Sequence, residues 1–210
     1  MNILVTGARG FVGRNLVESL KNIRDNKDRT RPELKIDNIF EYDIGTDSAE
    51  LERFCKDTDF VFDFAGVNRP KDSSEFVTGN VGFTSALIGL LEKHNNTCPI
   101  VFSSSVQATL AGRYANSEYG KSKLTAENLF LDYAKRTGAR VLVYRFPNLF
   151  GKWCRPNYNS AVATFCNNIA NDLPITVNDP SVELHLVYID DVVDELIGAL
   201  TGDEHRDGDF

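Results

Sequence analysis

The sequence has few of the residues that build metal sites and disulfide frameworks. Among 210 residues there are four cysteines and three histidines, and no two cysteines form a Cys-x-x-Cys pair. These residues are Cys55, Cys98, Cys154 and Cys166, and His94, His185 and His205. Because zinc and iron–sulfur sites need closely spaced ligands, the spacing argues against both. We therefore expect no metal, and a chain of this length can bury a core without one.

The chain also lacks an excess of positive charge and long apolar runs. Its 23 Lys and Arg residues are outnumbered by 30 Asp and Glu residues, which gives a net charge of −7. Binding to phosphate backbones needs clustered basic side chains, so the balance argues against nucleic acid as a partner. No uncharged apolar run reaches the roughly 18 residues of a membrane span, and the first residues do not resemble a signal peptide. We expect a cytoplasmic protein with reduced thiols and no membrane partner.

Short apolar runs alternate with longer segments of helical period along the chain. This alternation is typical of βαβ units and predicts an α/β fold, a Rossmann-like doubly wound parallel sheet. The predicted strands are residues 2–6, 36–42, 60–64, 100–103 and 140–145. The predicted helices are residues 11–20, 47–56, 75–94, 117–137 and 190–200, and a further helix ends near residue 171. Short strands are also expected near Ile175 and Leu184.

Three glycines follow the first predicted strand and open the helix after it. Gly7, Gly10 and Gly13 give the spacing G-x-x-G-x-x-G within a strand–turn–helix unit. Glycines permit a tight turn and close approach of a pyrophosphate, and the free N–H groups of the helix N-terminus attract its charge. The turn therefore predicts a dinucleotide site. We also assign Arg9, Phe11 and Val12, which lie among these glycines, to the dinucleotide site.

Two charged residues give opposite indications of which dinucleotide binds. Asp43 follows the second predicted strand, where a carboxylate can accept hydrogen bonds from the adenosine ribose and repel a 2′-phosphate, which favours NAD. Arg9 lies within the glycine turn, where its guanidinium can pair with a 2′-phosphate, which favours NADP. The sequence therefore does not decide between NAD and NADP. The alternative is that both side chains are solvated and contact neither cofactor.

A tyrosine and a lysine form Tyr-x-x-x-Lys on a predicted helix. Tyr119 and Lys123 stand at positions i and i+4, so they lie on one helix face. A phenol is a poor base at neutral pH, and a cationic lysine beside it should lower its pKa and favour the phenolate. Such a phenol can exchange a proton with a sugar hydroxyl or ketone as hydride moves. Ser105, just after the fourth predicted strand, can hydrogen-bond the same substrate oxygen.

The order of these motifs resembles the short-chain dehydrogenase/reductase superfamily, specifically its extended branch that acts on nucleotide sugars. The resemblance covers essentially the whole chain and implies that Ser105, Tyr119 and Lys123 form a catalytic triad. It also implies cofactor contacts from the loop after the third strand, from a helix asparagine and from a proline after the fifth strand. These residues are Ala65, Gly66, Val67, Asn80 and Pro147. By the same resemblance, Asn148 contacts the sugar or its diphosphate.

Two segments resemble the reductase domain of CapF-type capsular polysaccharide enzymes more closely. They are Ala65-Gly-Val-Asn-Arg-Pro70 and Pro147-Asn-Leu-Phe-Gly-Lys-Trp-Cys-Arg-Pro-Asn-Tyr-Asn-Ser160. This resemblance implies reduction of the C4 ketone of a UDP-2-acetamido-2,6-dideoxy-hexos-4-ulose with NADPH, in surface polysaccharide biosynthesis. Substrate contacts beside Asn148 are assigned to Asn68, Arg69, Trp153, Tyr158 and Asn159.

Other activities of the same fold stay open. Dehydratases of this branch carry an Asp-Glu pair directly after the catalytic hydroxyl residue, where this chain has Val106 and Gln107, so dehydration is disfavoured. A UDP-sugar 4-epimerase with tightly bound NAD and a non-catalytic NAD(P)-binding regulator are the alternatives to a reductase.

The motifs also predict how the chain is organised. We assign residues 1–200 to one NAD(P)-binding reductase domain, with a small substrate-binding region at about residues 147–188. The polar residues 201–210 are expected to be disordered. Because the extended reductases are usually longer, we expect the chain to be the N-terminal part of a longer protein. The family often dimerises through the helix that bears Tyr119 and the helix before it, so a homodimer is expected.

Overall fold

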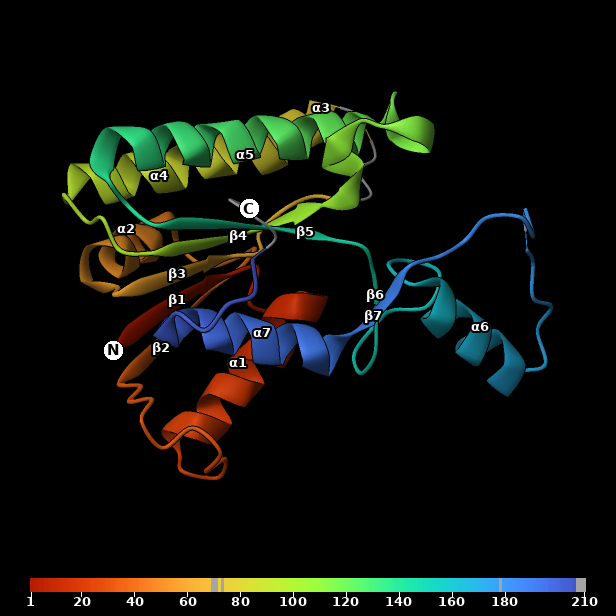
Figure 1. The fold of residues 1–210 in the computed structure, drawn as a ribbon, viewed down its shortest axis with the longest axis horizontal. Coiled ribbons are helices and arrows are strands. Elements are labelled where there is room, and N and C mark those ends of the chain that lie inside the picture. Colours follow the sequence, from red (N-terminus) through yellow and green to blue (C-terminus); the bar gives the residue numbers. More distant parts are fainter. Residues whose placement is uncertain (69–71, 73, 178, 207–210) are drawn as a thin grey trace.

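The centre of the molecule is a parallel sheet, seen in a computed structural model that describes residues 1–68, 72, 74–177 and 179–206 (Figure 1). The strands are β1 (Asn2–Thr6), β2 (Asn38–Tyr42), β3 (Phe60–Asp63), β4 (Ile100–Ser105) and β5 (Val141–Phe146). Neighbouring strands all pair in parallel, in the order β2-β1-β3-β4-β5. The order reverses between β1 and β3, and ligand crevices form at the carboxyl ends of strands at such a switch point. The expected doubly wound α/β fold is confirmed.

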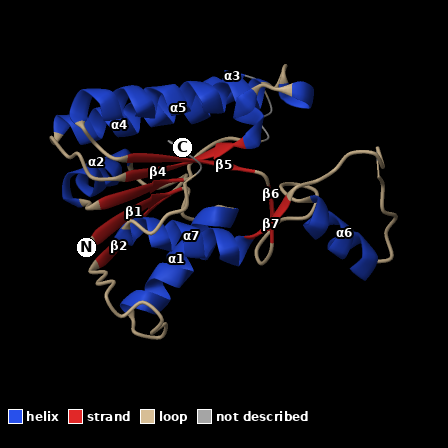
Figure 2. Ribbon diagram, viewed as in Figure 1, coloured by secondary structure: helices blue, strands red, loops and turns tan. Residues whose placement is uncertain are grey.

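Helices cover both faces of the sheet, which is why its strands are apolar nearly throughout (Figure 2). The helices are α1 (Phe11–Arg24), α2 (Ser48–Asp57), α4 (Phe83–Lys93), α5 (Glu118–Thr137) and α7 (Ile189–Thr201). One face packs against α1 and α7, and the other packs against α2, α4 and α5. In β1, Ile3 and Val5 belong to the first core and Leu4 to the second, and all three side chains are fully buried. Alternating side chains thus build two cores on one sheet.

The helix expected at residues 75–94 is divided into three parts. It begins as α3 (Ser74–Phe76), continues as a π-helical segment, η1 (Val77–Gly82), and becomes α4 at Phe83. Wider π-helical turns commonly lie at functional sites. Here the turn holds Asn80, whose buried side chain bonds to the loop after β3. Apolar periodicity does not reveal this change, because the widened turn is held by contacts with a distant loop.

A small region lies beyond one end of the sheet (Figure 1). It contains β6 (Asn148–Phe150), α6 (Ala161–Ala170) and β7 (Leu186–Tyr188), and β6 pairs in parallel with β7. The strand expected near Ile175 is absent from the described residues, and the one expected near Leu184 begins at Leu186. Strand β6 was not among the strands predicted from the sequence. Its partner is more than 30 residues away in the chain, so local sequence carries no sign of the pairing.

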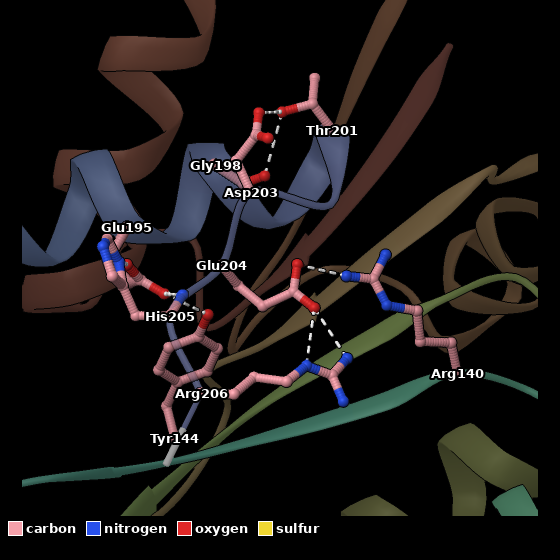
Figure 3. A network of polar contacts seen from close by, with 9 residues as sticks. All are labelled: Arg140, Tyr144, Glu195, Gly198, Thr201, Asp203, Glu204, His205 and Arg206. Atoms are coloured by element: carbon pink, nitrogen blue, oxygen red, sulfur yellow. Dashed lines mark hydrogen bonds and ion pairs between the residues drawn. The ribbon is translucent and has the colours of Figure 1, made fainter. Parts of the chain in front are cut away.

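The first residues of the expected disordered tail have defined contacts instead. Thr201 ends α7, and the carboxylate of Glu204 lies between two guanidinium groups (Figure 3). The contacts join Glu204 to Arg140 and Arg206, and Glu195 to His205 and Tyr144. Ion pairs thus give residues 201–206 defined contacts in the structure, although this segment has little apolar surface. Residues 207–210 lie outside the described residues.

Three further features bear on the sequence predictions. All four cysteines are free thiols. In the described part of the chain, no three or more His, Cys, Asp or Glu side chains gather where a metal ion could bind. Across the same residues, none of the helices combines the length and apolar character needed to cross a bilayer.

Candidate active site

The glycine turn lies at the carboxyl end of β1, beside the switch point of the sheet. Gly7 has φ +62°, and a Cβ atom there would lie 2.7 Å from the carbonyl carbon of Phe64. A Cβ atom on Gly13 would lie 2.1 Å from the carbonyl oxygen of Gly7. Both contacts are with backbone atoms, which cannot move aside, so the turn requires glycine at these positions. The sequence prediction of a tight strand–helix turn is confirmed.

Helix α1 presents an uncapped N-terminus to this crevice. Its N-cap is Gly10, which has no side chain to bond the first N–H groups, and its first turn has no acidic residue. These N–H groups and the positive end of the helix dipole can therefore bind an anion. The N-terminus has the chemistry that a pyrophosphate needs.

A cavity of about 660 Å³ extends from the glycine turn across the ends of β2 and β3. Most of the residues assigned to a cofactor line it: Gly7, Arg9, Gly10, Phe11, Asp43, Ala65, Gly66 and Val67. Trp153, Tyr158 and Asn159 also line it. The volume lies within the range of small-molecule sites, and the lining includes polar residues, among them Arg9 and Asp43. The residues present therefore fit a nicotinamide dinucleotide.

The loop after β3 is held by Asn80 of the π-helical segment. The Oδ1 atom of Asn80 accepts a hydrogen bond from the backbone N–H of Val67 at 2.8 Å, and its Nδ2 atom donates to the oxygen of Val67 at 3.2 Å. Nδ2 also donates to Oγ of Ser122 in α5 at 2.9 Å. Asn80 is buried and lines neither of the two cavities described here. Its position favours a role in fixing the cofactor loop, and the sequence did not indicate Ser122 as its partner.

A second cavity, of about 310 Å³, brings the three expected catalytic residues together. Ser105, Tyr119 and Lys123 all line it, with Pro147 and Asn148 from the segment after β5. Ser105 ends β4, and the other two lie on α5, whose N-cap Ser117 accepts a hydrogen bond from the N–H of Gly120 at 2.9 Å. Gly7, Gly10, Val12 and Gly13 line this cavity too, so it adjoins the glycine turn.

The three consecutive serines at the end of β4 have different partners. The Oγ atom of Ser103 donates to the backbone oxygen of Asp63 at 3.1 Å, and that of Ser104 donates to Glu127 at 2.5 Å. Oγ of Ser105 accepts a hydrogen bond from the N–H of Gln107 at 3.2 Å. An accepting hydroxyl keeps its own hydrogen for another partner, so Ser105 is the serine that can donate to a substrate oxygen.

The pKa of Tyr119 departs from the sequence expectation. Burial raises the pKa of this phenol to about 12, where a neighbouring cation was expected to lower it. The Nζ atom of Lys123 lies 6.0 Å from the centre of the Tyr119 ring and donates to the backbone oxygen of Ser103 at 2.9 Å. Burial also lowers the pKa of Lys123 to about 8. Desolvation therefore sets the direction of both pKa shifts, and Tyr119 holds its proton.

A buried carboxylate at the end of β3 was not identified from the sequence. Asp63 is fully buried, and its Oδ1 atom accepts a hydrogen bond from Oγ1 of Thr6 at 2.5 Å. Its Oδ2 atom has no hydrogen-bond partner among the described residues. Burial raises the pKa of Asp63 to about 6, and the Thr6 hydroxyl and the Lys123 cation oppose that rise. Only its place two residues before Ala65 in the sequence gave a sign that Asp63 lies beneath the site.

The residues assigned to substrate are divided between the two cavities. Asn68, Asn148, Tyr158 and Asn159 line the cavity that contains the triad. Trp153 lines only the larger cavity, where the guanidinium of Arg14 lies 4.3 Å from the centre of its ring. The structure thus places Trp153 beside α1, and it does not line the cavity that contains Tyr119. Arg69 lies outside the described residues.

A parallel sheet with a glycine turn at its switch point, and a serine, tyrosine and lysine in one adjoining cavity, define a nucleotide-dependent oxidoreductase or epimerase of the Rossmann type. Residues 3–209 match the sequence model of the NAD dependent epimerase/dehydratase family. The chain belongs to this family.

Two relatives are similar over nearly the whole chain. A UDP-2-acetamido-2,6-beta-L-arabino-hexul-4-ose reductase from Pseudomonas aeruginosa is 42% identical over 202 residues, which cover 96% of this chain and 50% of the relative. The capsular polysaccharide assembling protein CapF from Staphylococcus aureus, in its crystal structure, is 41% identical with a TM-score of 0.80, over 99% of this chain and 51% of that protein. The chain thus spans about half the length of each. The resemblance to CapF-type enzymes is confirmed.

A more distant structure agrees in fold. The UDP-glucuronic acid 4-epimerase from Bacillus cereus, solved in complex with NAD, superposes with a TM-score of 0.76 at 23% identity, over 96% of this chain and 74% of the epimerase. At this identity the match supports the fold alone.

Proposed function

We propose that the protein reduces the C4 ketone of a UDP-2-acetamido-2,6-dideoxy-hexos-4-ulose with NAD(P)H, in surface polysaccharide biosynthesis. The observation that carries the proposal is the convergence of Ser105, Tyr119 and Lys123 in a cavity that adjoins the glycine turn. The reductase from Pseudomonas aeruginosa supports the substrate class, since it is named for a closely related UDP-linked ketone.

In this proposal Tyr119 and Ser105 act on the C4 oxygen of the substrate, and Lys123 acts on the cofactor beside it. The bound dinucleotide supplies a hydride to the C4 carbon. The phenol of Tyr119 gives its proton to the C4 oxygen as negative charge develops there. The hydroxyl of Ser105 donates a hydrogen bond to the same oxygen. Its oxygen accepts from the N–H of Gln107, which leaves its hydrogen available for this bond. The Nζ atom of Lys123 is anchored on Ser103 and keeps further N–H groups for the cofactor ribose.

Tyr119 carries the proton that reduction of a ketone requires. A reductase begins with a protonated phenol, and burial holds the pKa of Tyr119 at about 12. A 4-epimerase begins by removing a proton from the substrate hydroxyl, which needs the phenolate first. Dehydration needs a carboxylic acid beside the triad, and Val106 and Gln107 occupy the positions after Ser105. A regulator without catalysis has no need of the triad geometry.

The test is turnover of the UDP-linked ketone by the purified protein, followed by loss of nicotinamide absorbance. Tyr119→Phe is expected to abolish turnover and to leave dinucleotide binding intact, because only the proton donor is removed. Ser105→Ala is expected to lower kcat by about 10²-fold, as for loss of one hydrogen bond to a developing oxyanion. Tyr114→Phe is the matched control, since Tyr114 lies in η3 (Gly112–Tyr114) and lines neither cavity. Unchanged turnover in Tyr119→Phe contradicts the proposal.

Two further predictions accompany this function. A homodimer through α4 and α5 is tested by the molar mass of the protein in solution. A cytoplasmic location is tested by cell fractionation.

A further inference from the structure

We propose that Asp63 is a positioning residue for the reaction, whose buried carboxylate is the counter-ion that keeps the amine of Lys123 charged in the active-site cavity. The inference rests on the proposed function in that it concerns the lysine of the same triad. Asp63 ends β3 and lines neither of the two cavities described above. It can therefore act on the reaction only through another residue.

The sheet brings Asp63 to the face that α5 covers. In the parallel register Asp63 pairs with Thr6 of β1 and with Phe102 of β4, so the three side chains leave the sheet on one face. Phe102 belongs to the core that packs against α5, and the Nζ atom of Lys123 lies 4.8 Å from the centre of its ring. The amine of Lys123 thus lies over the strand next to that of Asp63.

Hydrogen bonds through Ser103 hold the two residues in this arrangement. The Oγ atom of Ser103 donates to the backbone oxygen of Asp63 at 3.1 Å, and the Nζ atom of Lys123 donates to the backbone oxygen of Ser103 at 2.9 Å. The amine is also closely packed on its other side, since a Cβ atom on Gly66 would lie 3.2 Å from Nζ. Lys123 is therefore fixed beside the end of β3.

Lys123 is the cation that balances the Asp63 carboxylate. Asp63 is fully buried, and the Thr6 hydroxyl that donates to its Oδ1 atom is neutral. Its Oδ2 atom has no hydrogen-bond partner in the part of the chain that the structure describes. A buried charge is costly unless a charge of opposite sign lies near it. Burial raises the pKa of Asp63 to about 6 and lowers the pKa of Lys123 to about 8, and the attraction between the two groups opposes both shifts.

A second carboxylate near Lys123 is already neutralised. Glu127 lies one turn further along α5, and its charge also raises the pKa of Lys123. Its Oε2 atom, however, pairs with the guanidinium of Arg145 at 2.6 Å, and its Oε1 atom accepts from Nε of the same group at 2.9 Å. This bidentate pair cancels most of the field of Glu127 at Lys123, which leaves Asp63 as the uncompensated negative charge.

The remaining titratable groups beside the pair are neutral. Cys55 of α2 lies close enough to interact with Asp63, and burial raises the pKa of its thiol to about 12. Burial likewise raises the pKa of Tyr119 to about 12. Neither group carries a charge near neutral pH, so the charge of Lys123 depends chiefly on Asp63.

A charged Lys123 assists the step that Tyr119 performs. When the phenol gives its proton to the C4 oxygen it becomes a phenolate, and a cation beside it stabilises the new charge. Without the Asp63 carboxylate, burial alone would act on Lys123, and more molecules would hold it as a neutral amine near pH 8. Asp63 thus extends the pH range of the reaction upward.

The first experiment measures the charge of Lys123 without cofactor or sugar. Trace acetic anhydride reacts with a neutral amine and not with an ammonium group, so labelling of Lys123 at a series of pH values, read by mass spectrometry, follows its titration. The midpoint in the wild type should lie near pH 8. Asp63→Asn keeps an acceptor for Thr6 and loses the charge, and an opposite charge nearby moves a pKa by about one pH unit or more. The charged fraction of Lys123 in this variant should therefore be about fivefold lower at pH 8.

Two more variants complete the labelling experiment. Cys55→Ala is the matched control, because it disturbs the packing beside Asp63 without removing a charge, and the midpoint should not move. Asp63→Ser removes the same charge with a smaller side chain and should move the midpoint as Asp63→Asn does, so the test does not depend on the folding of one variant. Circular dichroism identifies the folded variants.

The second experiment is the pH profile of kcat/KM for sugar reduction. Asp63→Asn should lose about fivefold at pH 8 and return to within about twofold of the wild type at pH 6, where Lys123 is charged in both proteins. A purely structural defect lowers kcat/KM at both pH values alike.

The outcomes separate this inference from the proposed function. A labelling midpoint that is the same in the wild type and in the folded Asp63 variants overturns the inference, as does an equal loss of kcat/KM at both pH values. A shifted midpoint in the variants, with no sugar reduction by the wild type, overturns the proposed function alone. Sugar reduction by the wild type with an unshifted midpoint in the variants overturns the inference alone.

Discussion

Replacing Asn80 with alanine tests whether the π-helical segment fixes the cofactor loop. The substitution removes three hydrogen bonds, two to Val67 and one to Ser122, and leaves the N–H of Val67 without its partner. Each bond contributes about 1 kcal/mol, and an unpaired backbone donor adds about 1 kcal/mol, so the free energy of unfolding should fall by about 4 kcal/mol. Because the loop lines both cavities, dinucleotide affinity should fall about tenfold as its preorganisation is lost.

Urea unfolding followed by circular dichroism measures the stability change, and calorimetry measures the affinity. Ser122→Ala removes one of these three bonds and also the hydrogen bond that Oγ of Ser122 donates to the backbone oxygen of Tyr119 at 2.8 Å, so it should cost about 2 kcal/mol. In the double variant the two losses should fall short of additivity by about 1 kcal/mol, since the shared bond is lost only once. The reasoning is refuted if Asn80→Ala lowers the free energy of unfolding by less than about 0.5 kcal/mol and leaves the Kd unchanged.

Three further predictions follow from close contacts and shifted pKa values. Gly13→Ala should abolish dinucleotide binding, measured by calorimetry, because the new Cβ atom would lie 2.1 Å from the oxygen of Gly7. Burial raises the pKa of Asp63 to about 6. The free energy of unfolding of the wild type should therefore fall as pH rises from about 4 to 6, because Asp63 ionises in the unfolded state first. Asp63→Asn lacks this loss, so urea unfolding should show that it gains stability relative to the wild type over that range. The guanidinium groups of Arg140 and Arg206 lower the pKa of Glu204 to about 2, so Glu204→Gln should lower the Tm at pH 7, and the difference should vanish as pH falls toward 2.

The sequence predicted the parts of the fold that local pattern determines. Apolar runs and helical period gave the five strands of the sheet and the helices that cover it. The helix predicted at residues 117–137 matches α5, which Ser117 caps at its N-terminus and Gly138 ends in a left-handed conformation. The pairing of β6 with β7 and the contacts of Glu204 depend on residues far apart in the chain, so no local pattern predicted them.

The site shows the same division between local and distant effects. The glycine turn and the pair of Tyr119 and Lys123 have fixed spacings within single elements, and the structure places them in adjoining cavities. Asp63 and Ser122 were missed because their roles depend on neighbours from other elements. The pKa of Tyr119 was expected to fall, and it rises because burial, which the sequence does not show, dominates over charge.

The central claim is that hydride moves from the dinucleotide to C4 of a UDP-linked ketone while Tyr119 supplies the proton. The most direct measurement uses nicotinamide cofactor deuterated at the transferred position and locates the label in the product by mass spectrometry and NMR. We expect one deuterium at C4 per cofactor consumed with the wild-type protein, and none with Tyr119→Phe. A sugar without deuterium at C4, or turnover with no net consumption of cofactor, would contradict it.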